Sequence, residues 1–421
     1  MASLLFHHFF LLSILIIFSS SSLCQSQFPK SGYITLPTKL DPATHQYYTS
    51  SIGIGTPKHK MNLVIALEQD ALWYDCNSHY NSSSYIPITC HDPTYCPPTA
   101  SCFNCSLGPR KPGCTDNTCA YQVYNPFLTV FFPSADLGTD LLYLPRVNIP
   151  QRFLSACFES DGPFIVIPVL DGLVKGANGI LGLGRNSKLP LPIQVSSLYN
   201  VIPKFAICLP SSEKSIGNVF IGGTPYALNS VPNRVAFAIS TDPNSREYFV
   251  NVNSIKIDGE LVNVSGKGFD GNIKISTLSN FTVLHSSIYK PFVRDFVTHA
   301  KAMKIKKVKA VKPFAACFDG KSIVKKNGVP DVPGVNLLLE ENEGVSYEIN
   351  GHNSMFEVKK DVMCLAFVDG GKQANTGIIL GGYQMEDRIL EFDLSTSILR
   401  FSDSLLHHSN ASCSNPASLN F

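Results

Sequence analysis

Short runs of β-branched and aromatic residues recur along the whole chain and constrain its fold more than any other feature. Examples are residues 217–223 (GNVFIGG), 247–257 (EYFVNVNSIKI) and 388–401 (RILEFDLSTSILRF), and glycine, proline and asparagine punctuate the stretches between such runs. This pattern is typical of β-strands joined by tight turns. Strands so numerous and so short predict an all-β fold built from barrel-like units.

The length of the chain and a weak internal repeat predict two such units. At 421 residues the chain is too long for one small core and suits two domains of about 190 residues each. An apolar segment with glycines occurs once in each half, at residues 179–185 (GILGLGR) and 378–382 (IILGG). We therefore expect two related lobes, residues 25–215 and 216–421.

One stretch carries the periodicity of a helix. Between residues 287 and 303, Ile288, Phe292, Phe296 and Ala300 recur at four-residue spacing, which places them on one face of a helix. The sequence thus predicts a protein made mostly of strands, with a few short helices.

The N-terminus has the features of a secretory signal peptide. The apolar run LLFHHFFLLSILIIFSS precedes the small-x-small triplet Ser22-Leu23-Cys24, which predicts a signal peptide over residues 1–24, cut before Gln25. No lysine or arginine precedes the run, so an uncleaved anchor is the alternative. No other stretch approaches the ~20 apolar residues that a transmembrane helix needs. We expect a secreted, extracellular protein without membrane contact after cleavage.

The overall charge is nearly balanced, with 34 basic and 32 acidic residues and a net charge of +2. This balance gives no reason to expect nucleic acid or a membrane surface as a partner. A basic run nevertheless follows the predicted helix. It consists of Lys301, Lys304, Lys306, Lys307, Lys309 and Lys312. A solvated face is the simple interpretation, and a patch for acidic pectin or an acidic partner is the alternative.

Cysteine usage predicts disulfides and neither a metal nor a cofactor. Removal of Cys24 with the leader leaves twelve cysteines, and an even number in a secreted chain implies six disulfides. These are Cys76, Cys90, Cys96, Cys102, Cys105, Cys114, Cys119, Cys157, Cys208, Cys317, Cys364 and Cys413. The sequence CFNC at 102–105 could instead bind zinc, but the paired spacing of a zinc ribbon is absent.

Residues 63–76 (LVIALEQDALWYDC) have the frame of a catalytic loop without its catalytic residue. Together with the preceding residues 47–57 (YYTSSIGIGTP), they resemble the first hairpin and active-site loop of the pepsin-like aspartic proteases. In that family the loop reads apolar-apolar-apolar-Asp-Thr/Ser-Gly-Ser and ends in a tryptophan, here Trp73. The resemblance places Ala66 at the catalytic aspartate and Glu68 at the glycine.

The second half resembles the second active-site loop of the same family. Residues 273–284 (IKISTLSNFTVL) place Ser276 at the second aspartate and Leu278 at its glycine. The active site of such proteases needs two carboxylates about 3 Å apart that share one proton. Neither an alanine nor a serine side chain supplies one in the useful pH range. The alternative, that Asp70 or Asp75 is the true acid, requires a misalignment of at least four residues.

The resemblance implies a bilobal pepsin-like fold of two six-stranded barrel-like lobes without catalytic residues. Glycine permits a tight loop close to a substrate, so Glu68 and Leu278 also argue against an intact catalytic geometry. A further departure is Asn125-Pro126, which stands where active plant relatives have the turn Tyr-Gly-Asp-Gly-Ser.

Five Asn-x-Ser/Thr sequons predict glycosylation in a secreted protein. They are Asn81, Asn104, Asn263, Asn280 and Asn410. Asn280 lies inside the second active-site-like loop, so either it is buried and unmodified or its glycan covers part of the cleft.

Within the pepsin-like fold, three segments resemble a plant group of xyloglucanase-inhibitor proteins, extracellular dermal glycoprotein, wheat-type xylanase inhibitors and basic 7S globulins. The segments are residues 275–292 (ISTLSNFTVLHSSIYKPF), 350–371 (NGHNSMFEVKKDVMCLAFVDGG) and 381–394 (GGYQMEDRILEFDL). The resemblance implies binding to microbial glycoside hydrolases, with loops of the C-terminal lobe filling the sugar cleft. Such a cleft holds two carboxylates, which a cation or a hydrogen-bond donor would engage.

The residues that would perform this inhibition differ from those of the group. The resemblance to the xyloglucanase inhibitors implies that arginines on two loops would have this role, and these positions align with Asn327 and Asn375 here. Lys325, Lys326 and Lys372 lie nearby and could replace them, although lysine lacks the planar fork of arginine. His352 could also contact a carboxylate of the target, but an ordinary surface histidine is the simpler interpretation.

Three functions follow as hypotheses. The first is a catalytically inactive, secreted inhibitor of microbial cell-wall glycoside hydrolases of the xyloglucanase or xylanase class, acting in plant defence in the apoplast. The second is a non-inhibitory storage or binding protein of the basic 7S globulin type, which would bind a peptide or a wall polysaccharide. The third is a residual aspartic endopeptidase.

Overall fold

The computed structural model describes most of the chain between residues 28 and 414. The described ranges are 28–76, 80–97, 100–105, 109–128, 131–159, 169–224, 234–238, 245–264, 271–339, 345–372, 376–406 and 413–414. The predicted signal peptide, Asn375 and Asn410 lie outside these ranges. Within them, every helix is too short or too polar to cross a membrane.

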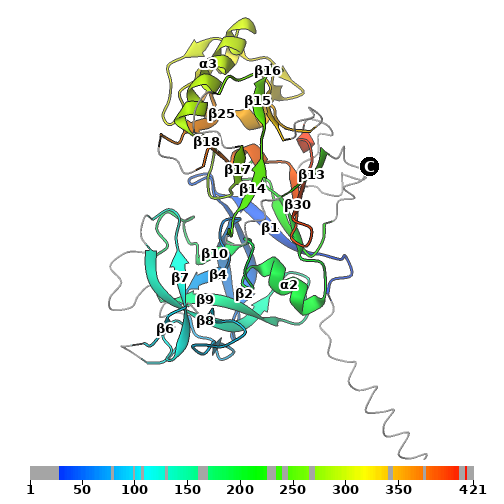
Figure 1. Cartoon of the computed structure of the whole chain (residues 1–421). Coiled ribbons are helices and arrows are strands. Elements are labelled where there is room, and N and C mark those ends of the chain that lie inside the picture. The colour runs from blue at the N-terminus through cyan, green and yellow to red at the C-terminus, as the bar shows by residue number, and fades with distance from the viewer. Residues whose placement is uncertain are drawn as a thin grey trace, which may run out of the picture.

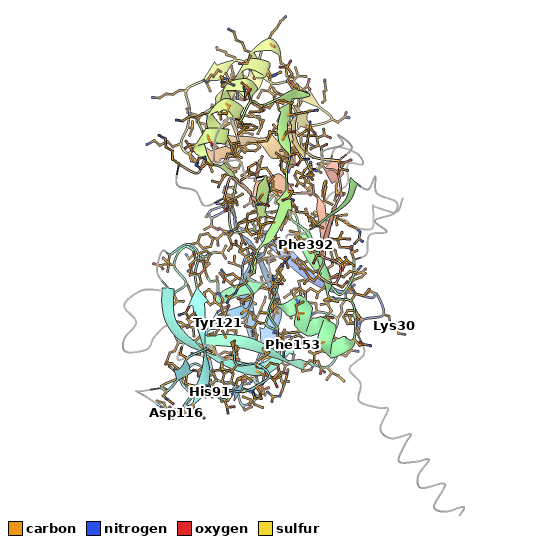
Figure 2. All side chains as sticks on the ribbon, in the orientation of Figure 1. Lys30, His91, Asp116, Tyr121, Phe153 and Phe392 are labelled. Atoms are coloured by element: carbon orange, nitrogen blue, oxygen red, sulfur yellow. A yellow bond between two sulfur atoms is a disulfide. The ribbon has the colours of Figure 1, made fainter. Side chains whose placement is uncertain are left out.

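Two lobes lie end to end and share one layer of strands where they meet (Figure 1). In spatial order this layer contains β13 (Arg234–Ala238), β30 (Ile398–Phe401), β29 (Ile389–Asp393), β11 (Lys204–Cys208), β12 (Gly217–Ile221) and β1 (Ile34–Leu40). The pair β11 and β29 joins the two halves of the chain, and Phe205 stacks on Phe392 with ring centroids 4.7 Å apart. Figure 2 labels Phe392 where the lobes meet. Residues 215 and 216, the expected domain boundary, lie in the turn between β11 and β12.

The N-terminal lobe extends the same sheet. Its strands, in spatial order, are β2 (Tyr47–Ile54), β3 (His59–Ala66), β10 (Gly179–Gly182), β4 (Leu72–Asp75), β9 (Gln151–Phe158), β8 (Phe131–Tyr143), β7 (Thr118–Tyr124) and β6 (Cys102–Phe103). The short strand β5 (Ile86–Pro87) pairs with β8. Strand β2 also pairs with β8, which stands further along this order. The sheet therefore folds back on itself.

The C-terminal lobe consists of smaller sheets. One contains β14 (Tyr248–Asn251), β17 (Asn272–Ile275), β28 (Ile378–Leu380), β18 (Thr282–Leu284) and β27 (Phe367–Asp369). A second contains β16 (Glu260–Leu261), β15 (Ser254–Ile257), β23 (Val335–Leu338) and β24 (Ser346–Ile349). A third contains β19 (Lys307–Val308), β20 (Cys317–Asp319), β26 (Val362–Leu365) and β25 (Met355–Lys359), and the hairpin β21 (Lys325–Lys326) and β22 (Val329–Pro330) stands apart.

Helices are few in the described ranges, as the sequence predicts. The long helix α3 (Ser286–Ala302) buries Ile288, Phe292, Phe296 and Ala300, the four residues on which its prediction rests. Helix α2 (Leu191–Tyr199), which the sequence analysis did not identify, begins directly after Pro190 and has a second proline in its first turn. Proline suits the start of a helix, because the first amide groups have no partner there. The others are single turns, α4 (Gly351–Ser354), α5 (Gly382–Met385) and η1 (Gly320–Ser322).

The internal repeat is visible in the strand pairing. In the N-terminal lobe β10 runs parallel to β3 and antiparallel to β4, and β4 runs parallel to β9. In the C-terminal lobe β28 has the same relation to β17 and β18, and β18 runs parallel to β27. The two lobes therefore repeat one four-strand motif, and the two active-site-like loops follow corresponding strands, β3 and β17.

Candidate functional site

The two loops stand at the ends of the corresponding strands and are supported from behind by glycines. Gly182 is opposite Ala66 in the β3–β10 pair, and a side chain added to it would meet the carbonyl oxygen of Ala71 at 2.4 Å. Gly381 follows β28, and an added side chain would meet the backbone of Phe281 at 2.3 Å. The two apolar–glycine segments therefore pass close behind the loops, where no larger residue fits.

Direct hydrogen bonds join the two loops. The hydroxyl of Thr277 donates to the carbonyl oxygen of Ile65 at 2.8 Å and accepts from the backbone N–H of Leu67 at 3.1 Å. Leu67 occupies the matching position in the first loop but has no hydroxyl, so it cannot make the reciprocal pair. The contact is thus one-sided, although it still holds both loops together at the base of the cleft.

Ala66 and Ser276 leave the two acid positions of a protease without a carboxylate, and Glu68 brings a carboxyl group into contact with Ser276. Ala66 is fully buried and contributes a methyl group. The Ser276 hydroxyl donates to Oε1 of Glu68 and accepts from the backbone N–H of Ser279 at 2.9 Å. Within the described residues Oε2 of Glu68 is buried without a hydrogen-bond partner. Burial raises the pKa of the Glu68 carboxyl above its ordinary value.

The alternative acids, Asp70 and Asp75, do not reproduce the dyad. Asp70 accepts a hydrogen bond from the Tyr121 hydroxyl at 2.5 Å and pairs with the Arg246 guanidinium at 3.2 Å. Asp75 ends β4, where it is opposite Phe158 of β9. Asp70 therefore ties the two halves of the chain across the cleft, and its carboxylate is already engaged by two donors.

A cleft of about 1260 Å³ opens above this floor, between the lobes. Its floor and walls include Glu68, Ser276 and Leu278 from the loops, Tyr121, Tyr124 and Phe127 from β7 and the turn after it, Tyr95, and Arg246 and Lys274 from the C-terminal half. Lys274 pairs with Glu247 at 2.5 Å. Figure 2 labels Tyr121 in the N-terminal lobe, on the side toward the C-terminal lobe. The cleft combines aromatic surface with charges of both signs.

The turn after β7 is fixed to the body of the lobe. The Asn125 side chain is fully buried, and its amide donates to the carbonyl oxygens of Val169 at 2.7 Å and Asp171 at 3.0 Å. Its side-chain oxygen accepts from the backbone N–H of Phe127 at 3.0 Å. The residue that the sequence marks as a departure from active relatives thus pins this turn in place.

The inhibitory-loop candidates Lys325, Lys326 and Asn327 meet on the hairpin β21–β22. Asn327 and Gly328 have φ values of 51° and 83°, which is the two-residue turn that favours the pair Asn-Gly. The Val324 side chain is 64% exposed beside the two lysines. Lys326 pairs with Asp331 at 2.8 Å, whereas Lys325, the other lysine of this hairpin, has no ion pair among the described residues.

Lys372, the remaining described candidate, belongs to a different loop. It follows β27, and its carbonyl oxygen lies 3.0 Å from Nε2 of His285, which caps α3. No hydrogen bond or ion pair between described residues joins this loop to the hairpin. His352 is partly exposed: its Nε2 lies 3.8 Å from Oδ2 of the buried Asp387, and burial lowers the pKa of its imidazole.

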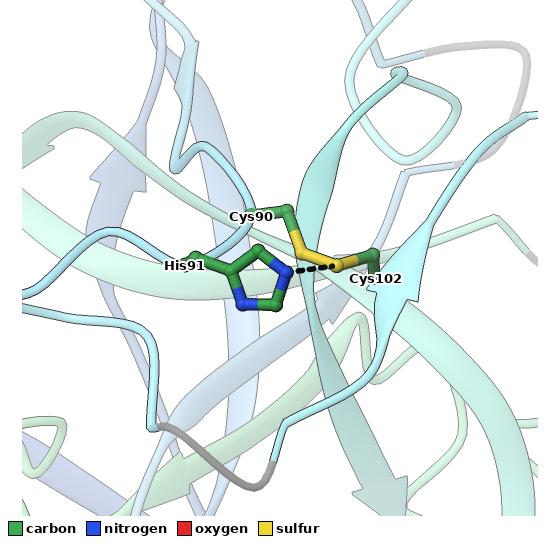
Figure 3. A group of neighbouring side chains, drawn as sticks. All are labelled: Cys90, His91 and Cys102. Carbon is green, nitrogen blue, oxygen red and sulfur yellow. Dashed lines mark hydrogen bonds between the residues drawn. A yellow bond between two sulfur atoms is a disulfide. The ribbon is translucent and has the colours of Figure 1, made fainter.

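Six disulfides join the twelve cysteines. The pairs are Cys76–Cys157, Cys90–Cys102, Cys96–Cys119, Cys105–Cys114, Cys208–Cys413 and Cys317–Cys364. Figure 3 shows His91 beside the Cys90–Cys102 bond, with Nε2 of His91 3.4 Å from Sγ of Cys102. Because both cysteines of the CFNC stretch are oxidised, neither can offer a zinc ion a thiolate.

The accessible sequons are distinguished from Asn280 by their contacts. Asn81, Asn104 and Asn263 are exposed. The Asn280 amide donates to the carbonyl oxygen of Thr44 at 2.8 Å, and its side-chain oxygen is buried. The structure thus describes Asn280 as an internal contact between the two halves of the chain.

Strand order, duplicated loops and cleft define a bilobal pepsin-like protein in which neither acid position carries a carboxylate. Residues 48–223 match the family described as xylanase inhibitor N-terminal, and residues 247–403 match xylanase inhibitor C-terminal. The chain therefore belongs to the plant xylanase-inhibitor family of pepsin-like aspartic-protease homologues.

Individual relatives agree with this assignment. A protein called probable aspartic proteinase GIP2, from Nicotiana benthamiana, is 36% identical, and the match covers 97% of each chain. Gamma conglutin 1 from Prunus dulcis is 34% identical, with 99% of this chain and 97% of the relative covered. The crystal structure of EDGP is similar with a TM-score of 0.78 at 33% identity, covering 91% of this chain and 97% of that one. Soybean basic 7S globulin is similar with a TM-score of 0.76 at 26% identity, covering 91% and 98%.

Proposed function

We propose that this protein is a catalytically inactive, secreted inhibitor of a microbial cell-wall glycoside hydrolase. Membership of the xylanase-inhibitor family supports the class of target. The absence of a carboxylate at positions 66 and 276 supports the loss of proteolysis, because the reaction needs an acid and a base on the scissile bond. The predicted leader, the six disulfides and the exposed sequons support secretion and glycosylation.

The observation that carries this proposal is the exposed hairpin β21–β22. It presents an apolar side chain, Val324, and Lys325, which has no ion pair with a described residue, next to a narrow turn at Asn327 and Gly328. A glycosidase cleft is narrow and holds two carboxylates, so a protruding turn with a cation complements it in shape and charge. Because a two-residue turn is pre-organised, little conformational entropy would be lost when it enters the cleft.

The experiment compares two glycines in equivalent turns. Gly328 follows Asn327 in β21–β22, and Gly259 (φ 84°) follows Asp258 (φ 47°) in the turn between β15 and β16, with no atom within 4 Å of an added Cβ at either glycine. Gly328→Val and Gly259→Val should therefore strain the backbone similarly, by roughly 1 kcal/mol or more. We expect Gly328→Val to weaken inhibition of the most strongly inhibited hydrolase at least tenfold and Gly259→Val less than twofold.

The two variants also separate a local effect from a loss of folding. Circular dichroism and thermal unfolding should be alike for both, because each changes one exposed turn. Equal inhibition by wild type and Gly328→Val would remove the hairpin from the mechanism. Equal loss in both variants would assign the effect to stability.

A second candidate function is supported by the cleft itself. A cleft of about 1260 Å³ with Tyr95, Tyr124 and Phe127 on its walls is large enough for a peptide or a wall oligosaccharide. This is the binding or storage function suggested by relatives named conglutin and 7S globulin. Thermal stabilisation by peptides or by xyloglucan oligosaccharides, lost in Phe127→Ala, would support it; no stabilisation by any of them would argue against it.

A further inference from the structure

One segment of the C-terminal lobe carries a large excess of positive charge. Residues 286–330 contain ten lysines and one arginine against two aspartates, a net charge of +9 in a chain whose total is +2. The segment includes α3, which lies at the end of the C-terminal lobe farthest from the N-terminal lobe (Figure 1). Charge is therefore strongly segregated, although the overall composition conceals it.

The structure gathers lysines from three parts of the chain at one end of the sheet β19-β20-β26-β25. Strand β19 begins and β20 ends there, with the backbone N–H of Asp319 donating to the carbonyl oxygen of Lys306 at 2.8 Å. Strand β25 ends and β26 begins there, with Lys359 opposite Val362 and Val362 opposite Asp319. The N–H of Gly320 donates to the carbonyl oxygen of Asp361 at 2.8 Å, which joins the residue after β20 to the residue before β26.

Six lysines surround this end, which we call the basic sheet end. They are Lys304, Lys306, Lys307, Lys321, Lys359 and Lys360, and all are exposed. Neighbouring strands lie about 4.8 Å apart, so the row from β19 to β25 spans roughly 14 Å. Lys309 and Lys312, which belong to the basic run in the sequence, lie beyond the opposite end of β19.

The nearby acids do not neutralise this surface. Asp319 uses its carboxylate to accept the backbone N–H of Lys321 at 3.1 Å, and Asp361 pairs with the Lys321 ammonium at 3.2 Å. The other five lysines have no ion pair with any described residue. Their positive potential therefore extends into solvent and would attract an anionic partner.

The chemistry of the basic sheet end favours a charged polymer over a folded protein. Lysine is depleted from protein interfaces, which use aromatic residues and arginine at their centres. Lysine ammonium groups are hydrated point charges on flexible stems, without the fork that fixes a single carboxylate. Several such charges in a row match an anionic chain with regularly repeated carboxylates, bound mainly by screened electrostatic attraction.

We propose that the basic sheet end binds an acidic polysaccharide, a linear chain of uronic acid sugars. The site lies outside the interlobe cleft and does not depend on inhibition of a hydrolase. Its occupancy would retain the protein on a carboxylate-rich matrix.

The test uses the full secreted protein and immobilised polygalacturonate. The variant Lys306→Gln/Lys307→Gln/Lys359→Gln/Lys360→Gln is compared with Lys39→Gln/Lys60→Gln/Lys175→Gln/Lys214→Gln, which removes four exposed lysines of the N-terminal half. Both variants have the same net charge. We expect the first to weaken binding at least tenfold at about 50 mM salt and the second less than twofold, with wild-type binding falling steeply as salt is raised.

Three outcomes would overturn the proposal. An equal loss in both variants would mean that net charge alone determines retention. Undiminished binding of wild type to the fully methyl-esterified polymer would exclude recognition of carboxylates. Tighter binding to poly-L-glutamate than to polygalacturonate would assign the surface to an acidic polypeptide.

Discussion

At the scale of single residues, Glu68 distinguishes the floor of this cleft from a proteolytic site. It stands where the protease loop has glycine, and its carboxyl reaches across to the Ser276 hydroxyl. Compared with a protease, this chain therefore has a carboxyl group two residues after the first acid position and none at either acid position. Burial raises the pKa of this carboxyl, and neither Ala66 nor Ser276 supplies the second carboxylate of a catalytic pair.

Asp136 leads to a prediction on pH. Burial raises the pKa of this carboxyl from 3.8 to about 6, although Thr115 donates to it. The unfolded chain ionises near 3.8 while the folded chain stays protonated, so stability should fall as pH rises from about 4 to 6, by roughly 3 kcal/mol at most. Burial also raises the pKa of Glu386, which acts in the same direction.

The measurement is urea unfolding of wild type and Asp136→Asn between pH 4 and 7. Asparagine keeps an acceptor for Thr115 but cannot ionise, so the variant should lose less stability over this interval. A wild-type protein that becomes more stable between pH 4 and 6 would contradict the prediction.

Asn280 leads to a prediction on glycosylation. Its amide is bonded to Thr44 and its oxygen is buried, so a glycan at this position would prevent the contact between the two halves. We expect glycopeptide mass spectrometry of the folded protein to find glycans at Asn81, Asn104 and Asn263 and none at Asn280. Comparable occupancy at Asn280 would show that this loop is open in the native protein.

At the scale of elements, local patterns and long-range pairings differ in how far the sequence predicts them. The face of α3 follows from four apolar residues, and the strands follow from β-branched runs. The pairing of β11 with β29 joins segments nearly 190 residues apart, and no local pattern specifies it. Helix α2 has only nine residues, one of them a proline and preceded by another, too few to show clear periodicity.

In the candidate site too, the sequence predicts the local features but not the contacts between distant segments. The loss of both acids follows from the aligned loops, and the register of β3 with β10 agrees with that alignment. The bond between Ser276 and Glu68 and the tie between Asp70 and Arg246 depend on two distant segments meeting. The basic run was visible in the sequence, but Lys359 and Lys360 join it only through the pairing of β20 with β26.

The turn after β7 allows a test at this scale. Asn125→Ala removes two donated bonds and one accepted bond from a fully buried side chain, at a cost of about 1–3 kcal/mol. We expect faster amide hydrogen exchange in residues 118–128 of the variant. Gln122→Ala, an exposed position on the same strand, is the control and should leave exchange unchanged; equal exchange in both variants would show that Asn125 does not pin the turn.

At the scale of the whole molecule, the protein keeps the duplicated framework of a protease without a carboxylate at either acid position. Shared strands, glycine-backed loops and the cross-loop bonds of Thr277 persist, because they stabilise the fold independently of catalysis. Binding surfaces can then change freely on loops, such as β21–β22, that the framework positions.

This view predicts that restoring the acids alone will not restore proteolysis. In Ala66→Asp/Ser276→Asp, Glu68 would become a third carboxyl at the floor, and like charges would raise the pKa values of all three. Glu68 and Leu278 would also still occupy the two glycine positions. We expect no casein cleavage between pH 3 and 5. Cleavage that a statine-type inhibitor blocks would show that the loops retain a catalytic geometry.

The most direct test of the central claim is a titration of purified wild-type protein against secreted microbial xyloglucanases and xylanases, with release of reducing sugar as the readout. We predict that at least one hydrolase is captured by the immobilised protein and loses its activity in proportion to the protein added, up to one equivalent. Full activity of every hydrolase at a large molar excess, with none captured, would contradict the assignment as an inhibitor.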